Sequence, residues 1–288
     1  MHFQNLLHHH FFAMEKAAYY AALQAPIHLH LGAMELPKVE MVAAENSYSS
    51  WEMQYYFGIK TDKQKSGLVA IIPVKGVLAP EWSWGGTNTE WLSQQIAIAI
   101  GNEAVSAIVL TGNSGGGAVT GTMAWANSIA TAKNQKPIVG HVQGMVASAA
   151  YWGFSACNEI FLESATTSAV GSIGVMSVYT SYAKQLEKEG IDVRVLRSKG
   201  AEDKALLHPA EALNEDALKE EQKLIDAMRV EFLGAVQSFR PQIINDPGGK
   251  LYYGRDAIRA GLADNVGTRS DAIKRADYLA RKAMSLTL

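Results

Sequence analysis

The sequence predicts an α/β fold with a mostly parallel sheet and flanking helices. From residue 67 onward, short β-branched runs alternate with amphipathic stretches of about 10–15 residues, a pattern typical of βαβ units. Hydrophobic residues make up 48% of the 288-residue chain, which is enough for a large buried core. Glycine, alanine and serine are concentrated between residues 97 and 175, and this favours close backbone approach.

The first 66 residues differ from the rest and predict an N-terminal arm or helical extension. They hold six of the eight histidines and many aromatic residues, and residues 6–23 are expected to form a helix. A polar linker at residues 60–66 separates this arm from a domain expected over residues 67–288.

The periodicity places each element of that domain in turn. Strands are expected over residues 68–74, 107–110, 137–142, 160–162, 174–178 and 191–196. Helices are expected over residues 88–100, 119–132, 148–156, 182–189 and 214–239. Polar caps at Thr87 or Asn88, and at Asn214, open the first and last of these helices.

Composition excludes several classes of function. With 26 Lys+Arg against 28 Asp+Glu, the net charge of −2 gives no electrostatic case for nucleic acid or an anionic membrane as partner. The single cysteine, Cys157, excludes an internal disulfide and cysteine-rich zinc sites. Residues 8–10 are consecutive histidines that would not face one way on a helix, so no metal site is expected. With no secretory signal and no span of about 20 apolar residues, we expect a soluble, cytoplasmic protein without cofactor or metal.

Three loops could carry chemistry. Residues 112–117 follow a predicted strand, and their G-x-S-x-G spacing makes Ser114 a candidate nucleophile; an oxyanion loop or a plain tight turn are the alternatives. Ser148 begins a predicted helix and is either a nucleophile or an N-cap. Residues 199–209 carry Lys199 and Lys204, which are candidate general bases or solvated side chains.

Histidine is scarce outside the arm, and this bears on the choice of base. Beyond residue 30 only His141 and His208 remain. A Ser114 hydrolase would use His208, with Asp192 or Asp203 as the orienting acid. A serine–lysine dyad needs no histidine.

Five segments, in order, resemble motifs of the signal peptide peptidase A family of serine–lysine peptidases. They are N-S-G-G-G at residues 113–117, M-V-A-S-A-A-Y at 145–151, G-S-I-G-V at 171–175, the lysine loop at 200–209, and Y-Y-G-R-D-A-I-R-A-G-L-A-D at 252–264. Lys204 stands five residues before Pro209, as the family's base does, whereas Lys199 does not.

The resemblance implies a Clp/crotonase-like fold of repeated ββα units and a role for each matched residue. It implies a catalytic set of Ser148 as nucleophile, Lys204 as base and Ser172 as the group that orients the lysine, with oxyanion donors at Gly116 and Ala149 and substrate-binding positions at Gly115, Gly117 and Gly171.

Within the family, residues 171–190 look most like the phage and prophage capsid maturation proteases. The resemblance therefore implies capsid or scaffold proteins as substrates, a homo-oligomer, and action in the host cytoplasm or within the prohead. Three departures stand out: Gly115 replaces the usual proline, Ala149 and Ala150 replace glycines, and Glu202 and Asp203 precede the lysine.

Four alternatives stay open. A cytoplasmic signal-peptide-peptidase-like protease would use the same residues, and a Ser114-centred α/β-hydrolase would not. An acyl-CoA-binding crotonase-type enzyme would need catalytic carboxylates; Glu159 and Glu163 follow Ser148, but neither lies in a motif like that family's. An inactive assembly protein could also keep the fold. A Clp-type triad is not expected, because the position of its histidine falls near Ser172.

Overall fold

The core of the molecule is a mostly parallel sheet, as the sequence predicts. The computed structural model describes residues 12–14, 37–43, 67–80 and 86–285. The main strands lie in the order β10 (Asn265–Val266), β7 (Glu159–Leu162), β6 (Ile138–Ala147), β5 (Val105–Ala118), β3 (Leu68–Ala79) and β2 (Glu40–Ala43). All neighbouring pairs are parallel except β2–β3, which is antiparallel.

Four short strands extend this sheet around one end of β5 and β6. They are β1 (Phe12–Met14), antiparallel to β5; β4 (Thr87–Asn88), parallel to β3; β8 (Ala169–Gly171), parallel to β6; and β9 (Leu251–Tyr253), antiparallel to β8. Because β1 and β8 join near the carboxyl ends of β5 and β6, they add backbone where parallel sheets usually carry their sites.

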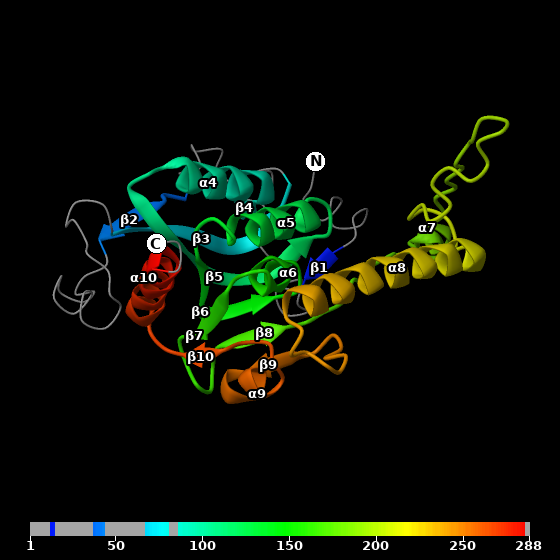
Figure 1. The fold of residues 1–288 in the computed structure, drawn as a ribbon. Coiled ribbons are helices and arrows are strands. Elements are labelled where there is room, and N and C mark those ends of the chain that lie inside the picture. Colours follow the sequence, from blue (N-terminus) through cyan, green and yellow to red (C-terminus); the bar gives the residue numbers. More distant parts are fainter. Residues whose placement is uncertain (1–11, 15–36, 44–66, 81–85, 286–288) are drawn as a thin grey trace.

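Helices cover both faces of the sheet (Figure 1). One face is covered by α4 (Thr89–Gly101), α5 (Thr122–Ala132), α6 (Ala149–Ser155) and the carboxyl end of α8 (Glu215–Phe239), and the other by α10 (Arg269–Ser285). Successive residues of β3 point to opposite faces, so that Ile72 packs toward α4 and α5 whereas Ile71 packs toward α10. Burial on both faces explains why the strands read as continuous apolar runs.

The predicted helix caps are confirmed. Asn88 Oδ1 accepts the Trp91 backbone N–H at 2.8 Å at the start of α4. Asn214 Oδ1 accepts the N–H groups of Asp216 and Ala217 at the start of α8, each at 3.0 Å. These bonds satisfy amides that the first turn of a helix leaves unpaired.

Several expected elements differ in the structure. The glycine run at residues 112–117 is the continuation of β5 rather than a loop. Neither residues 174–178 nor residues 191–196 form a strand among the described residues: the first segment has only an isolated bridge at Met176, and the second pairs with no described strand. Residues 12–14 are a strand and not helix, whereas the rest of the helix expected over 6–23 lies outside the described residues, as do the histidines at 8–10.

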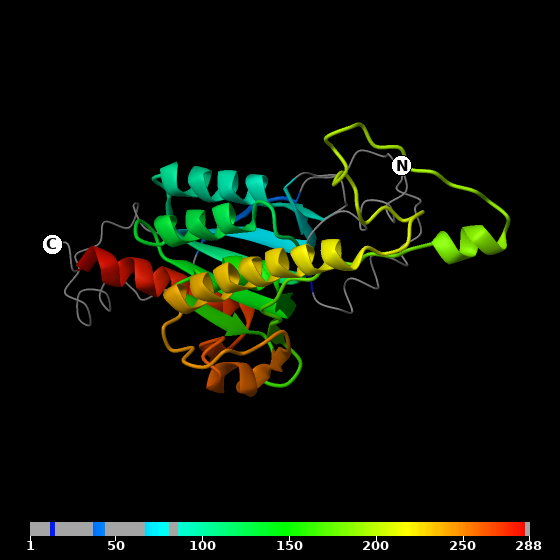
Figure 2. The same ribbon diagram turned by 90° about the vertical axis from the view of Figure 1, so that its right-hand side faces the viewer.

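Two short helices complete the chain, and one of them marks a projecting arm. The helix α9 (Gly254–Arg259) packs beside β8 and β9. The other, α7 (Ala183–Lys188), belongs to residues 180–213, which extend away from the sheet beyond the amino end of α8 (Figure 2). No helix in the described ranges has the length and apolar character needed to cross a bilayer.

Candidate active site

A sharp turn between β6 and α6 carries Ser148. Its φ of 55° and ψ of −124° lie in a region that residues with a Cβ rarely adopt, and this conformation joins a strand directly to a helix. The side chain is fully buried, and its Oγ has no hydrogen-bond partner among the described residues. A strained strand–turn–helix serine is the geometry of a nucleophile elbow, which the sequence had also suggested for Ser114.

Strand β8 fixes the position of this turn from one side. Ala147 is opposite Gly171 in the parallel β6–β8 pair, and the Ser148 N–H donates to the Gly171 carbonyl oxygen at 2.8 Å. Ser172 follows with the same φ of 55°, and its N–H donates to the Lys250 carbonyl oxygen at 2.9 Å. The structure therefore places Ser148 and Ser172 side by side, each one residue beyond the end of its strand.

The side chains of α6 anchor the turn from the other side. Trp152 stacks on Phe232 of α8, with ring centroids 4.4 Å apart and an interplanar angle of 6°. The Tyr151 hydroxyl donates to the Leu262 carbonyl oxygen at 3.0 Å. An added Cβ at Gly153 would lie 2.2 Å from the Trp125 ring. The backbone of α6 is therefore in direct contact with this ring of α5, and no larger residue fits at position 153. Ser148 thus sits on a tightly packed support.

The glycine-rich end of β5 lies beside this turn, at the carboxyl end of the sheet. Ser114 is opposite Val146, so residues 115–117 and Ser148 follow at the same end of neighbouring strands. Gly116 has a φ of 100°, and an added Cβ at Gly117 would lie 1.9 Å from the Leu78 carbonyl oxygen. Glycine is therefore required here by backbone conformation and by contact with β3.

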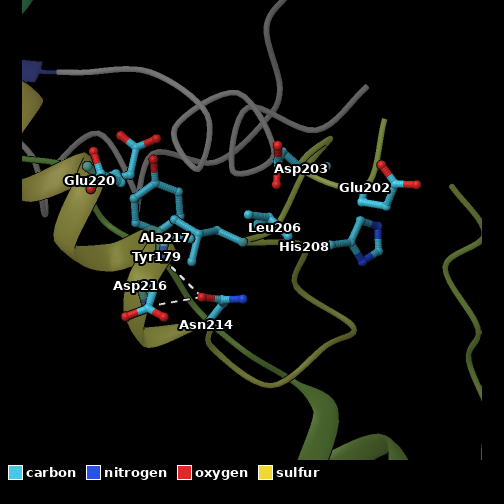
Figure 3. Close-up of a pocket in the computed structure, with 12 residues that line it drawn as sticks. Tyr179, Glu202, Asp203, Leu206, His208, Asn214, Asp216, Ala217 and Glu220 are labelled. Atoms are coloured by element: carbon cyan, nitrogen blue, oxygen red, sulfur yellow. Dashed lines mark hydrogen bonds between the residues drawn. The ribbon is translucent and has the colours of Figure 1, made fainter. Parts of the chain in front are cut away.

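The structure gives Ser114 a structural role. It lies inside β5, and its hydroxyl donates to the Gly76 carbonyl oxygen at 2.5 Å and accepts the Gly116 N–H at 3.2 Å. A residue within a continuing strand lacks the turn that a nucleophile elbow requires, so the elbow interpretation of Ser114 is wrong. Its proposed partner His208 lies on the projecting arm (Figure 3).

Lys204 also lies on that arm, exposed and without a hydrogen bond to Ser148. The loop around it is held by Arg197, whose Nε donates to the Lys204 carbonyl oxygen at 2.5 Å. Arg197 also donates to the Ala205 carbonyl oxygen at 2.8 Å and pairs with both carboxylate oxygens of Glu211. This pairing lowers the pKa of the Glu211 carboxyl. The structure orders the lysine loop but does not bring it to the serine.

A cavity of about 870 Å³ separates the lysine loop from the start of α8 (Figure 3). Its wall includes Tyr179, Asn214 and the acidic side chains Glu202, Asp203 and Glu220. Glu202 accepts the Gly200 N–H at 2.9 Å, which lowers the pKa of its carboxyl. The two acids before Lys204 therefore line a cavity of the arm and have no hydrogen bond to Ser148.

Other possible chemistries find little support. Glu159 on β7 forms a bidentate ion pair with Arg275, and Glu163 is exposed, so neither is placed as the carboxylate of a crotonase-type site. Burial raises the pKa of the Cys157 thiol to about 12, which makes it a poor nucleophile. Across the described residues, no group of three or more histidine, cysteine or acidic side chains is arranged to hold a metal ion.

Comparison with known proteins adds a family and several relatives. A model described as peptidase family S49 matches residues 130–282. The chain is 32% identical over 183 residues to a provisionally named protease of Methanocaldococcus jannaschii, covering 62% of this chain and 58% of the relative. It is 30% identical over 213 residues to capsid assembly protease C of Escherichia phage lambda, covering 71% and 48%. It is 29% identical over 244 residues to protease 4 of Salmonella typhi, covering 82% and 38%. The chain thus spans about half the length of the curated relatives it matches.

Proposed function

This chain belongs to peptidase family S49, and on that premise we propose that it is a serine endopeptidase whose nucleophile is Ser148 and whose general base is Lys204. The strained, buried turn at Ser148 carries the proposal, because it holds a hydroxyl at the junction of strand and helix, as a nucleophile elbow does. It leaves this hydroxyl free of any described partner, so that a base can reach it. The match spans both Ser148 and Lys204.

The proposed reaction begins with attack of Ser148 Oγ on the scissile carbonyl carbon. Neutral Lys204 takes the hydroxyl proton and later gives it to the leaving amine, after which water hydrolyses the acyl-enzyme. Ser172, which lies next to Ser148, would accept or donate a hydrogen bond that orients the lysine. The backbone N–H groups of Gly116 and Ala149 would stabilise the oxyanion, each worth about 3–4 kcal/mol in the transition state. The Gly116 N–H would exchange its bond with Ser114 for one to the oxyanion.

The remaining glycines would bind the substrate backbone. Gly115 and Gly117 extend β5 beside the turn, and Gly171 ends the strand on its other side. An extended peptide would run between them, and the small residues around Ser148 favour small side chains next to the cut.

The position of the arm bears on how the dyad forms. Residues 180–213 project from the body (Figure 2). Lys204, which belongs to this segment, is exposed. We propose that the chain acts as a homo-oligomer in which Lys204 of one copy reaches Ser148 of a neighbour.

Complementation tests this arrangement with fluorescein-labelled casein as substrate. Ser148→Ala and Lys204→Ala should each be inactive alone, and their equimolar mixture, unfolded and refolded together, should recover about one quarter of wild-type activity. If both variants are inactive and the mixture is too, the dyad forms within one copy. If Lys204→Ala stays active, lysine is not the base.

The proposed substrates are capsid or scaffold proteins of a tailed phage, processed in the host cytoplasm or within the prohead. The similarity to capsid assembly protease C supports this. Co-expression with the neighbouring head genes, with and without Ser148→Ala, tests it by mass spectrometry of the products. Cleavage of casein without cleavage of any head protein would favour a more general peptidase.

A further inference from the structure

The chain's own residues 12–14 lie on the edge where a peptide substrate would bind. Strand β1 pairs antiparallel with the glycine-rich end of β5, with Phe12 opposite Ala118, Ala13 opposite Gly117 and Met14 opposite Gly116. It also contacts α6, the helix that begins immediately after Ser148. Figure 1 shows β1 at the end of β5, next to α6.

This edge of β5 is open because the neighbouring strand β6 stops pairing with it. The β5–β6 pairing ends at Ser114 and Val146, since the chain then turns at Ser148 into α6. Beyond that point one edge of β5 is paired with β3, through Gly116 opposite Val77 and Gly117 opposite Leu78. The other edge would present unpaired N–H and C=O groups, and β1 covers it.

The edge suits main-chain recognition. Glycine backbone offers no side chain to obstruct an added strand, and the groups it presents pair with any extended peptide. Gly116 belongs to this pairing and is also the proposed oxyanion donor, so a strand seated here passes the reacting centre. The sequence of residues 12–14, Phe-Ala-Met, carries no charge.

We propose that residues 12–14 are an internal ligand of the peptide-binding edge and compete with substrate for it. The site is thereby assigned to extended, uncharged peptide segments that run antiparallel to β5. This inference rests on the proposed peptidase function for its effect on activity, but the strand pairing itself does not.

Proline substitution tests the pairing, because proline has no N–H to donate to a β-ladder. In an antiparallel pair, successive residues alternate between hydrogen-bonded and non-hydrogen-bonded positions. One of the two variants Ala13→Pro and Met14→Pro therefore removes an N–H that donates to β5. Ala13→Ser is the matched control, since it keeps the N–H at nearly the same size. All three are placed in the full chain carrying Ser148→Ala, so that no cleavage intervenes.

Deuterium uptake of the peptide spanning residues 112–119 is the first readout. At least one proline variant should exchange about threefold to tenfold faster than Ala13→Ser at the amides of residues 117 and 118, because the Gly116 N–H is already bonded to Ser114 Oγ. Equal uptake in all three variants would overturn the inference, whatever the protein does to substrates.

Activity is the second readout, measured in chains that retain Ser148. The proline variant that exchanges faster should cleave fluorescein-labelled casein about threefold to tenfold faster than Ala13→Ser, mainly through a lower KM. Faster exchange without faster cleavage would mean that the segment pairs with β5 without competing with substrate. Absence of cleavage in every Ser148 chain would instead count against the peptidase proposal and leave the exchange result standing.

Discussion

The backbone N–H of Ser148 donates to the carbonyl oxygen of Gly171 at 2.8 Å, so the turn that carries the proposed nucleophile is held by the strand that precedes Ser172. The two serines share a left-handed φ of 55° at the ends of adjacent parallel strands. A single ladder therefore sets the spacing between the proposed nucleophile and the residue proposed to orient its base.

Replacing Ser148 by alanine should separate activity from stability. Casein cleavage should fall by about 10⁴-fold or more, because the nucleophile is lost. The free energy of unfolding should stay the same or rise by about 1 kcal/mol, because a buried hydroxyl without a described partner is removed. Activity assays and urea denaturation of the same preparation check both parts.

Ser114→Ala is the control for that experiment. It removes the bond to the Gly76 carbonyl oxygen and should cost about 1 kcal/mol of stability while keeping measurable cleavage. An active Ser148→Ala beside an inactive Ser114→Ala would reverse the assignment.

Arg197 should act as a positioning residue for the lysine loop. Arg197→Met removes the bonds to the carbonyl oxygens of Lys204 and Ala205, and kcat should fall by about 10- to 100-fold with little change in KM. The melting temperature should hardly move, because the arm projects from the core. Arg197→Lys should not restore kcat, since an ammonium cannot reproduce the guanidinium's array of donors.

Arg194→Met is the matched control for Arg197. Arg194 lies three residues earlier, and within the described part of the chain its side chain pairs with Asp192 alone, at an exposed position. Its replacement should leave kcat unchanged, and an equal loss in both variants would point to a general effect of charge.

The ion pair between Arg240 and Asp264 should be a major stabilising contact. The Arg240 side chain is 2% exposed. It donates to Asp264 Oδ1 at 2.8 Å and to the Gly261 carbonyl oxygen at 2.9 Å. The other carboxylate oxygen of Asp264, Oδ2, accepts the Ile160 N–H. Arg240→Met leaves this carboxylate without its partner and should lower the free energy of unfolding by about 3 kcal/mol. Arg229→Met, which breaks a more exposed pair with Asp246, should cost about 1 kcal/mol or less in the same denaturation experiment.

His141 should make the fold sensitive to mild acid. Burial lowers the pKa of this residue below its ordinary 6.5, against the opposing effect of the Glu163 carboxylate. The unfolded chain therefore binds a proton more readily than the folded chain, so stability should fall as the pH drops through about 6.5 and below. The urea midpoint between about pH 7 and about pH 5.5 should show this slope in the wild type.

A His141→Gln variant should have a flatter profile over that range, because it carries no titrating ring. His208→Gln should keep the wild-type slope, since His208 lies on the arm outside the core. A wild-type slope in His141→Gln would assign the acid sensitivity to other groups.

The sequence predicts the Ser148 turn well because its signals are local. A buried strand, a serine and a run of small residues that can form a tightly packed helix are all visible within residues 138–156. The caps Asn88 and Asn214 are predicted for the same reason.

The misassigned segments depend on contacts from elsewhere in the chain. The glycines of β5 have a low strand propensity, so their sequence predicts a loop. They form a strand because β3 pairs with one edge of this segment and β1 with the other. Residues 191–196 have a strand-like pattern, yet no strand in the described ranges pairs with them, and Leu196 is 91% exposed. Strand β1 is three residues long and is specified by its partner rather than by its own sequence.

The stacked pair Trp152–Phe232 links the helix that follows the proposed nucleophile to the long helix that begins at the arm. Phe232 lies near the carboxyl end of α8, and the arm with Lys204 lies beyond the other end, about 26 Å away along the helix axis. Trp152 lies on the helix that begins after Ser148. Both rings are buried, so this contact holds α8 against the helix that follows Ser148. The direction in which α8 carries the lysine arm is thereby set by the same packing that supports the Ser148 turn.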